Sequence, residues 1–173
     1  MTVLALSLLI FFPMLIEAVR ARRNERAQKA RGGIEPQDDV YNIMRIAYPV
    51  AFLAMLAEWA LRPGTATAST AVVLVGVVIF AAAKIIKWSA ILALGRCWTF
   101  RVIVVPGDPL VASGPYRYFR HPNYVGVIGE LVGAAVMTRA LLAGPIAVIV
   151  FAVLLQKRIA VEDRALRAAK MAN

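Results

Sequence analysis

"TAVVLVGVVIFAAAKIIKWSAILALG", residues 70–95, is an almost unbroken apolar run in which Lys84 and Lys87 are the only charged side chains. A helix needs about 20 apolar residues to cross the hydrocarbon core of a bilayer. Because this run is longer than one crossing needs, we expect it to tilt or to project past the membrane surface. The stretch therefore predicts a transmembrane helix over about 69–94.

Further apolar runs lie on both sides of this stretch. The 173 residues are 61% hydrophobic with a mean hydropathy of +0.71, whereas soluble domains are about half apolar. We predict an all-α polytopic integral membrane protein with a single membrane domain over 1–173. Its five expected spans are about 2–19, 41–61, 69–94, 122–137 and 140–156. A cytosolic lid over 95–121 and a cytosolic tail over 157–173 complete the expected organisation.

The first apolar run has the length of a signal peptide as well as of a membrane helix. It lacks a basic region before it and an A-x-A-like cleavage site after it. The basic block "RARRNERAQKAR", residues 20–31, follows it in the manner of a stop-transfer signal. We therefore expect a retained membrane helix.

Basic residues predict the orientation in the membrane. Six lie in 20–31, four in 95–121 and five in 157–170, whereas the opposite side carries only Arg62 and Arg139. By the positive-inside rule the N-terminus is expected outside and the C-terminus in the cytosol, in an inner, plasma or endomembrane.

The net charge of +10 is also a property of nucleic-acid-binding proteins. In a membrane protein, loops that face an anionic inner leaflet explain it better, so we expect a membrane partner and no nucleic acid. Cys97 is the single cysteine, which excludes an internal disulfide and offers no metal cluster. We expect no bound metal, and a small buried apolar role for Cys97.

The last two spans are joined by only "TR", residues 138–139, and must form a tight antiparallel hairpin. The polar stretch "GPYRYFRHPNYVG", residues 114–126, then lies at the same mouth as the tail "QKRIAVEDRALRAAK", residues 156–170. Before the first of these, "RVIVV" and the turn residues "PGDP" predict a small hairpin or an extended lid.

The start of the fourth span carries candidate binding residues. Pro122 suits the first turn of a helix, where its missing N–H costs nothing. The next backbone N–H groups, of Asn123 and Tyr124, would form an anion site at the helix N-terminus. His121 is constrained by the proline that follows it, which favours a functional role. Arg117, Tyr118 and Phe119, in contrast, are better explained as membrane-surface anchors.

Three other ionisable residues are candidates. Arg158 and Glu162 are four residues apart, so they form either an intrahelical pair or a site in which Glu162 accepts hydrogen bonds from a ligand and Arg158 orients an anion. Glu130 lies near the middle of the fourth span, where a charge is costly. It could line a polar pocket, pair with Lys84 or Lys87, or be protonated.

The motif "LVASGPYRYFRHPNYVG", followed by a hairpin and "RIAVEDRAL", closely resembles the isoprenylcysteine carboxyl methyltransferase family. The pattern combines Gly-x-Tyr, Arg-His-Pro-x-Tyr and R-x-x-x-E-[ED]-x-x-L. The resemblance covers about 95–167, and phospholipid methyltransferases share its looser outline.

The resemblance implies S-adenosylmethionine as cofactor, held at the cytosolic face. The residues implied to bind it are Arg101, Asp108, Pro109, Leu110, Val111, Tyr116, His121, Pro122, Asn123, Tyr124 and Glu162. Arg158 is implied to face the substrate carboxylate, and we add Glu130 as a second substrate-binding candidate. Arg158, Glu162 and His121 are the catalytic candidates.

The function expected is methyl transfer to the carboxylate of a prenylcysteine-type or other isoprenoid or lipid substrate that enters from the bilayer. An ionised carboxylate needs no base, whereas a phenol or amine would need one, with His121 or Glu162 as candidates. Two groups of alternatives remain. One is N- or O-methylation of a phospholipid, quinone or phenolic lipid; the other is a non-enzymatic transporter or scaffold, or a membrane reductase.

Overall fold

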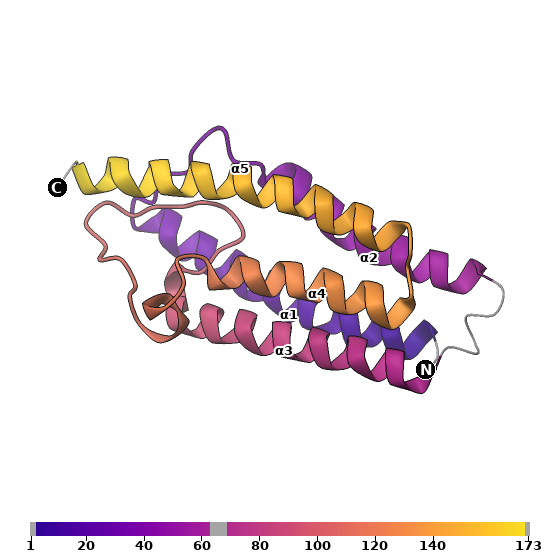
Figure 1. Ribbon diagram of the computed structural model, residues 1–173. Coiled ribbons are helices and arrows are strands. Elements are labelled where there is room, and N and C mark those ends of the chain that lie inside the picture. Colours follow the sequence, from indigo (N-terminus) through magenta and orange to yellow (C-terminus); the bar gives the residue numbers. More distant parts are fainter. Residues whose placement is uncertain (1–2, 63–68, 172–173) are drawn as a thin grey trace.

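The part of the chain that the structure describes, residues 3–62 and 69–171, folds into five long α-helices (Figure 1). The structure is a computed structural model. The α-helices are α1 (Val3–Ala30), α2 (Tyr41–Leu61), α3 (Thr70–Leu94), α4 (Pro122–Thr138) and α5 (Ala143–Met171), and two short 3-10 helices are η2 (Gly95–Cys97) and η3 (Gly114–Arg117). Among these residues there is no strand, only an isolated antiparallel bridge between Ile34 and Val104. The all-α prediction is confirmed.

Among the described residues, four helices are long and apolar enough to cross a membrane. They are α1, α2, α5 and the α3 run extended through η2 to Cys97. Many large apolar side chains on these helices are exposed, as expected for surfaces that face lipid. α4 has only 17 residues. The prediction of a polytopic integral membrane protein is confirmed.

α3 and α4 lie side by side, and their contact depends on glycine (Figure 1). A Cβ added to Gly76 would lie 2.3 Å from the backbone nitrogen of Met137, and one added to Gly133 would lie 2.5 Å from that of Phe80. Such close backbone approach through small residues is a common way to pack helices in membranes. α4 is thereby fixed against α3, with α2 and α5 packed against it as well.

Two helices extend beyond the expected spans. α1 continues to Ala30, so the basic block at 20–31 is helical almost to its end. α5 runs from Ala143 to Met171 without interruption, so the expected polar tail is the outer part of a membrane helix. Both extensions carry polar side chains away from the apolar part of the bundle.

The connection between α4 and α5 corrects the prediction of a two-residue link. It covers residues 139–142, and Arg139 ends α4 in the left-handed conformation with φ 51°. The Glu58 carboxylate of α2 accepts hydrogen bonds from the backbone N–H groups of Leu141, Leu142 and Ala143. A carboxylate is favourable at a helix N-terminus, so Glu58 fixes the start of α5.

The 95–121 segment is attached to α1 and to the connection at 31–40. Asn24 donates hydrogen bonds to the carbonyls of Gly95 and Trp98, at 3.0 and 2.7 Å, and Gln28 makes similar bonds to two more carbonyls. The sequence predicted a small hairpin or an extended lid here. Val104 pairs with Ile34 of the 31–40 connection, so the hairpin alternative is not observed in the described part of the chain. We call the end of the bundle where 20–40, 95–121 and 157–171 lie the motif end.

Candidate functional site

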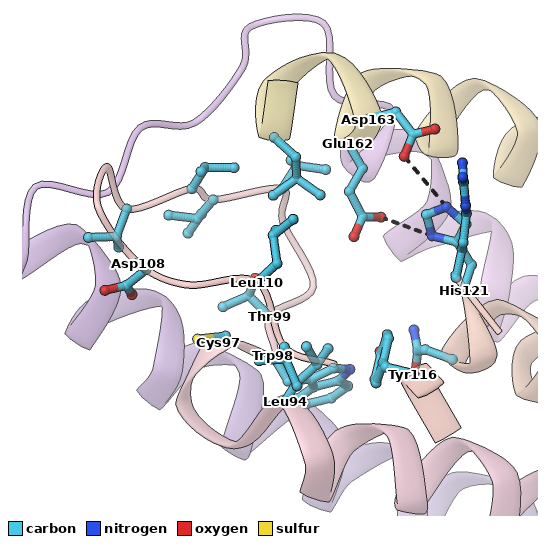
Figure 2. A pocket seen from close by; sticks show the side chains of 18 of the residues that line it. Leu94, Cys97, Trp98, Thr99, Asp108, Leu110, Tyr116, His121, Glu162 and Asp163 are labelled. Carbon is cyan, nitrogen blue, oxygen red and sulfur yellow. Dashed lines mark ion pairs between the residues drawn. The ribbon is translucent and has the colours of Figure 1, made fainter. Parts of the chain in front are cut away.

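A cavity of about 510 Å³ opens at the motif end, between the 95–121 segment and the outer part of α5 (Figure 2). We call it the first cavity. Most of the residues predicted to bind the cofactor line it: Arg101, Asp108, Pro109, Leu110, Val111, Tyr116, His121, Asn123, Tyr124 and Glu162, together with Arg158. Pro122 is buried in the first turn of α4 and does not line it.

The N-terminal end of α4 and the outer part of α5 meet at His121, as the hairpin argument predicted. The Tyr124 hydroxyl donates a hydrogen bond to Glu162 at 2.6 Å, and the His121 ring stacks on the Tyr124 ring with 5.4 Å between centroids. The two His121 ring nitrogens lie 3.8 Å from Glu162 and 3.6 Å from Asp163 (Figure 2). A protonated His121 would therefore be paired with two carboxylates.

The expected anion site at the start of α4 is only partly free. The Tyr124 N–H donates to the carbonyl of His121 at 3.1 Å instead of pointing freely at the cavity. The Asn123 side-chain oxygen, in contrast, is buried and accepts no hydrogen bond among the described residues. At this helix start, free hydrogen-bonding groups for a ligand therefore come from side chains more than from the backbone.

Arg158 pairs with a residue that the sequence did not single out. Its Nη1 lies 2.7 Å from Oδ1 of Asp39, and its Nε donates to the Tyr124 hydroxyl at 3.0 Å. Its remaining nitrogen donates to the carbonyl of Phe100. The intrahelical pair with Glu162 is therefore replaced by a pair with the α1–α2 connection.

Arg101 and Asp108 are held by ion pairs with residues before α2. Asp108 lies 2.5 Å from Arg31, and Arg101 pairs with Glu35 and lies over the Tyr41 ring, 4.6 Å from its centroid. Burial alone would raise the pKa of Glu35, but hydrogen bonds from Lys29 and Arg101 bring the pKa below its ordinary value. These pairs fix the wall of the first cavity that lies away from α5.

Tyr116 keeps its proton. Burial, and then the negative charge of Glu162, raise the pKa of the Tyr116 phenol well above its ordinary value. Tyr116 can donate a hydrogen bond to a ligand but not take a proton from one. Cys97 lines the cavity as a thiol and is half-buried, where full burial was expected.

The residues present fit S-adenosylmethionine. A volume of about 510 Å³ is within the range of small-molecule sites. Glu162 and Asp163 can face the cationic groups of the cofactor and its ribose hydroxyls, while Arg120 and Arg167, which also line the cavity, can face its carboxylate. The aromatic ring of Tyr116 offers an apolar surface beside them.

A second cavity, of about 480 Å³, lies among all five α-helices and was not predicted. Its apolar lining includes Met14, Met44, Val127, Phe151 and Leu155. It shares one wall with the first cavity, formed by Trp98, Thr99, Asn123, Tyr124 and Arg158. The indole nitrogen of Trp98 in this shared wall is buried and has no hydrogen-bond partner among the described residues. The second cavity is assembled from segments far apart in sequence, so no local motif indicates it.

Glu130 requires a correction, because it lines neither cavity. It is fully buried and pairs with Lys84 at 3.1 Å and with Lys87 at 3.3 Å. Glu17 of α1 pairs with the same two lysines, at 2.9 and 2.7 Å. The Tyr48 hydroxyl donates a further hydrogen bond to Glu130 at 2.6 Å. Of the three alternatives for Glu130, pairing with the lysines is the one observed. We call Glu17, Lys84, Lys87 and Glu130 the four-charge cluster.

Comparisons with known proteins identify the family. The model of the isoprenylcysteine carboxyl methyltransferase family matches residues 72–168, more than half of the chain. An uncharacterized protein of Bacillus subtilis strain 168, YpbQ, is 34% identical over 154 residues, which cover 87% of this chain and 88% of that protein. An uncharacterized protein of Haemophilus influenzae is 27% identical over 145 residues, 83% of each chain. No solved structure matches significantly. The chain belongs to the isoprenylcysteine carboxyl methyltransferase family, which supports a membrane methyltransferase.

Proposed function

We propose that this member of the isoprenylcysteine carboxyl methyltransferase family transfers a methyl group from S-adenosylmethionine to an oxygen of a lipid-like acceptor. The observation that carries the proposal is the shared wall between the two cavities. The first cavity is lined by the family motif with its exposed charged side chains, and the second lies between apolar helices. A water-soluble donor and a lipid acceptor could therefore meet at one place from opposite sides.

The cofactor belongs in the first cavity. Glu162, fixed by the Tyr124 hydroxyl at 2.6 Å, would accept hydrogen bonds from it. S-adenosylmethionine supplies a methyl group on a positively charged sulfur, which an acceptor oxygen takes as the carbon–sulfur bond breaks and its electron pair stays on sulfur. The chain contributes orientation and exclusion of water, which help most when donor and acceptor are held in line.

The acceptor belongs in the second cavity, which it would enter from the bilayer. By the name of the family, its reacting group is the carboxylate of a prenylcysteine-type or other isoprenoid lipid. Such a carboxylate is already ionised, so none of the side chains in the shared wall has to remove a proton. Arg158 is the cation in that wall.

A hydroxyl of a phenolic or quinone-type lipid is the second candidate acceptor. The observation that favours it is the Asp39 carboxylate 2.7 Å from Arg158, which already neutralises the cation expected to hold a substrate carboxylate. A hydroxyl would need a base, and Glu162 or His121 at the edge of the shared wall would serve.

The basic residues of the motif end support its placement on the cytosolic side of the membrane. Arg20, Arg22, Arg23 and Arg26 belong to the outer part of α1. This part of α1, the 95–121 segment and the outer part of α5, which all carry basic residues, lie at one end of the bundle (Figure 1). By the positive-inside rule, the N-terminus would then lie outside and the C-terminus in the cytosol. The whole chain acts in this proposal as one membrane unit.

Calorimetry with the purified protein tests the cofactor assignment. Wild type should bind S-adenosylmethionine, and His121→Ala and Glu162→Ala should each bind it at least about tenfold more weakly, because a charge-assisted hydrogen bond is lost. Asp38→Asn is the matched control, since Asp38 is exposed and its ion pair is with Arg164, which does not line the cavity. Wild type that does not bind the cofactor contradicts the proposed function, and unchanged affinity in both alanine variants contradicts the residue assignment. Methyl transfer to N-acetyl-S-farnesylcysteine and to a long-chain alkylphenol then compares the two acceptors.

A further inference from the structure

Asp39, at the end of the α1–α2 connection, is bonded to three separate parts of the molecule. Its Oδ1 accepts hydrogen bonds from Nη1 of Arg158 at 2.7 Å and from the backbone N–H of Tyr41 at 3.1 Å. Its Oδ2 accepts one from the backbone N–H of Val102 at 2.9 Å. Its side chain is only 4% exposed. Asp39 thus joins α5, the start of α2 and the 95–121 segment at one buried carboxylate.

The neighbouring Asp38 shows how specific this placement is. Its side chain is 61% exposed and pairs with Arg164, whose side chain is 64% exposed. Such an exposed pair contributes little to stability and has no effect on a buried wall. Two adjacent aspartates therefore differ in burial and in partner, and Asp39 is the one that pairs with Arg158 of the shared wall.

The cations buried in the lining of the second cavity are already neutralised. Arg158 is paired with Asp39, and Lys87 with the carboxylates of the four-charge cluster. Arg22 and Arg45 also line this cavity, but both are exposed at its rim. An acceptor carboxylate brought to the shared wall would meet Arg158 and the negative Asp39 together, so the attraction of one is offset by the repulsion of the other.

We infer that Asp39 determines the specificity of the acceptor site: by neutralising Arg158, it makes the shared wall favour an uncharged hydroxyl over a carboxylate. This inference rests on the proposed function, in which the second cavity holds the acceptor. Burial strengthens the effect, because charges interact more strongly where water is excluded. Arg158 then serves as a hydrogen-bond donor of fixed orientation.

A hydroxyl acceptor requires a place for its proton. Methyl transfer forms a carbon–oxygen bond and breaks the methyl–sulfur bond, whose electron pair stays on the sulfur of S-adenosylmethionine. The hydroxyl proton passes to Glu162, the carboxylate of the first cavity that accepts a hydrogen bond from the shared-wall Tyr124. The charges then balance, because the sulfonium charge is lost and Glu162 becomes neutral.

The test compares two probes that share one apolar chain, dodecanol and dodecanoate. Their binding to the full chain in phosphatidylcholine nanodiscs is followed by tryptophan fluorescence at neutral pH. Wild type is expected to prefer dodecanol. D39N should shift the affinity ratio towards dodecanoate by about tenfold or more, because it leaves the positive charge of Arg158 unopposed. D38N should leave the ratio unchanged.

A double-mutant cycle of Asp39 and Arg158 separates a change in specificity from a general loss of binding. R158Q leaves the Asp39 charge unopposed and should shift the ratio further towards dodecanol, while the double variant D39N/R158Q keeps the wall neutral and should restore the wild-type ratio. If the role of Asp39 were purely structural, D39N would weaken the binding of both probes equally and leave their affinity ratio unchanged. Should D39N fail to fold, R158Q and the double variant still test the ratio.

Two results would overturn the inference. One is a wild-type protein that prefers dodecanoate, and the other is an unchanged ratio in D39N or R158Q with normal binding of S-adenosylmethionine. Absence of cofactor binding by wild type contradicts the proposed function instead, so the two failures are distinguishable.

Discussion

The two cavities meet at one wall, yet their charges are arranged in opposite ways. In the first cavity Glu162 and Asp163 are 32% and 34% exposed and face open space together with Arg120 and Arg167. In the second, Lys87 and Glu17 are 4% and 1% exposed and paired with one another. Water can stabilise the charges of the first cavity, whereas buried charges need partners. The first is therefore suited to an ionic ligand and the second to an amphiphile without a buried net charge.

The pairing of buried charges predicts the largest effect. Glu130→Gln leaves two buried lysines with a single carboxylate, and we expect it to destabilise the protein by about 3–5 kcal/mol. Thermal unfolding in detergent measures this loss. The charge-balanced double variant Lys87→Met with Glu130→Gln should recover most of it. A single variant as stable as wild type would show that the second cavity tolerates unpaired charge, and the contrast between the cavities would not hold.

The shared wall predicts an effect on both cavities at once. Tyr124→Phe removes the hydroxyl that joins Glu162 to Arg158, at 2.6 and 3.0 Å. Because hydrogen bonds to charged groups contribute about 1.5–3 kcal/mol, we expect at least about tenfold weaker binding of both S-adenosylmethionine and dodecanol. Calorimetry and fluorescence measure the two losses. Tyr118→Phe is the control, since Tyr118 is 79% exposed and lines neither cavity. A loss confined to one ligand would mean that the wall does not couple the two sites.

The smallest effect is expected from the ion pairs of Glu35 beside the first cavity, as a dependence of stability on pH. Lys29, at 2.7 Å, and Arg101 keep the pKa of Glu35 below its ordinary value of 4.5. Because the pKa of Glu35 is lower in the folded than in the unfolded protein, ionised Glu35 stabilises the fold at every pH above its unfolded-state pKa. This stabilisation is lost as the pH falls through its folded-state pKa. Glu35→Gln should therefore be less stable than wild type by about 1 kcal/mol or less at neutral pH, with the difference vanishing at acidic pH. Thermal unfolding across this range measures it, and a difference that persists at low pH would contradict this role of the ion pairs.

Local sequence was sufficient to predict the helices and the meeting of two motifs. α2 occupies 41–61 and α4 begins at Pro122, because uninterrupted apolar runs and a proline in the first turn are local signals. A short connection between antiparallel helices also brings His121 to Glu162, and this required only the order of the elements. The length of the α4–α5 connection was not predicted, because the residue that caps α5, Glu58, belongs to another helix.

The second cavity and its charges could not be predicted in this way. Asp39 lies 119 residues from Arg158 in sequence, and Tyr48 lies 82 residues from Glu130. Each pair depends on how the helices rotate and cross, which is set by contacts such as those of Gly76 and Gly133 between α3 and α4. Sequence patterns report the direction of a side chain from its own helix axis but not which neighbour it meets.

The sequence by itself determined the membrane helices, the family and most of the lining of the first cavity, because hydropathy and a contiguous motif are properties of neighbouring residues. Only the tertiary structure decided that Glu130 belongs to a charge cluster, that a second cavity adjoins the first, and that Arg158 is neutralised. The physical reason is that a buried charge depends on the partners that packing brings to it. Here α1, α2 and α3 supply the groups around Glu130, and the α1–α2 connection supplies the partner of Arg158.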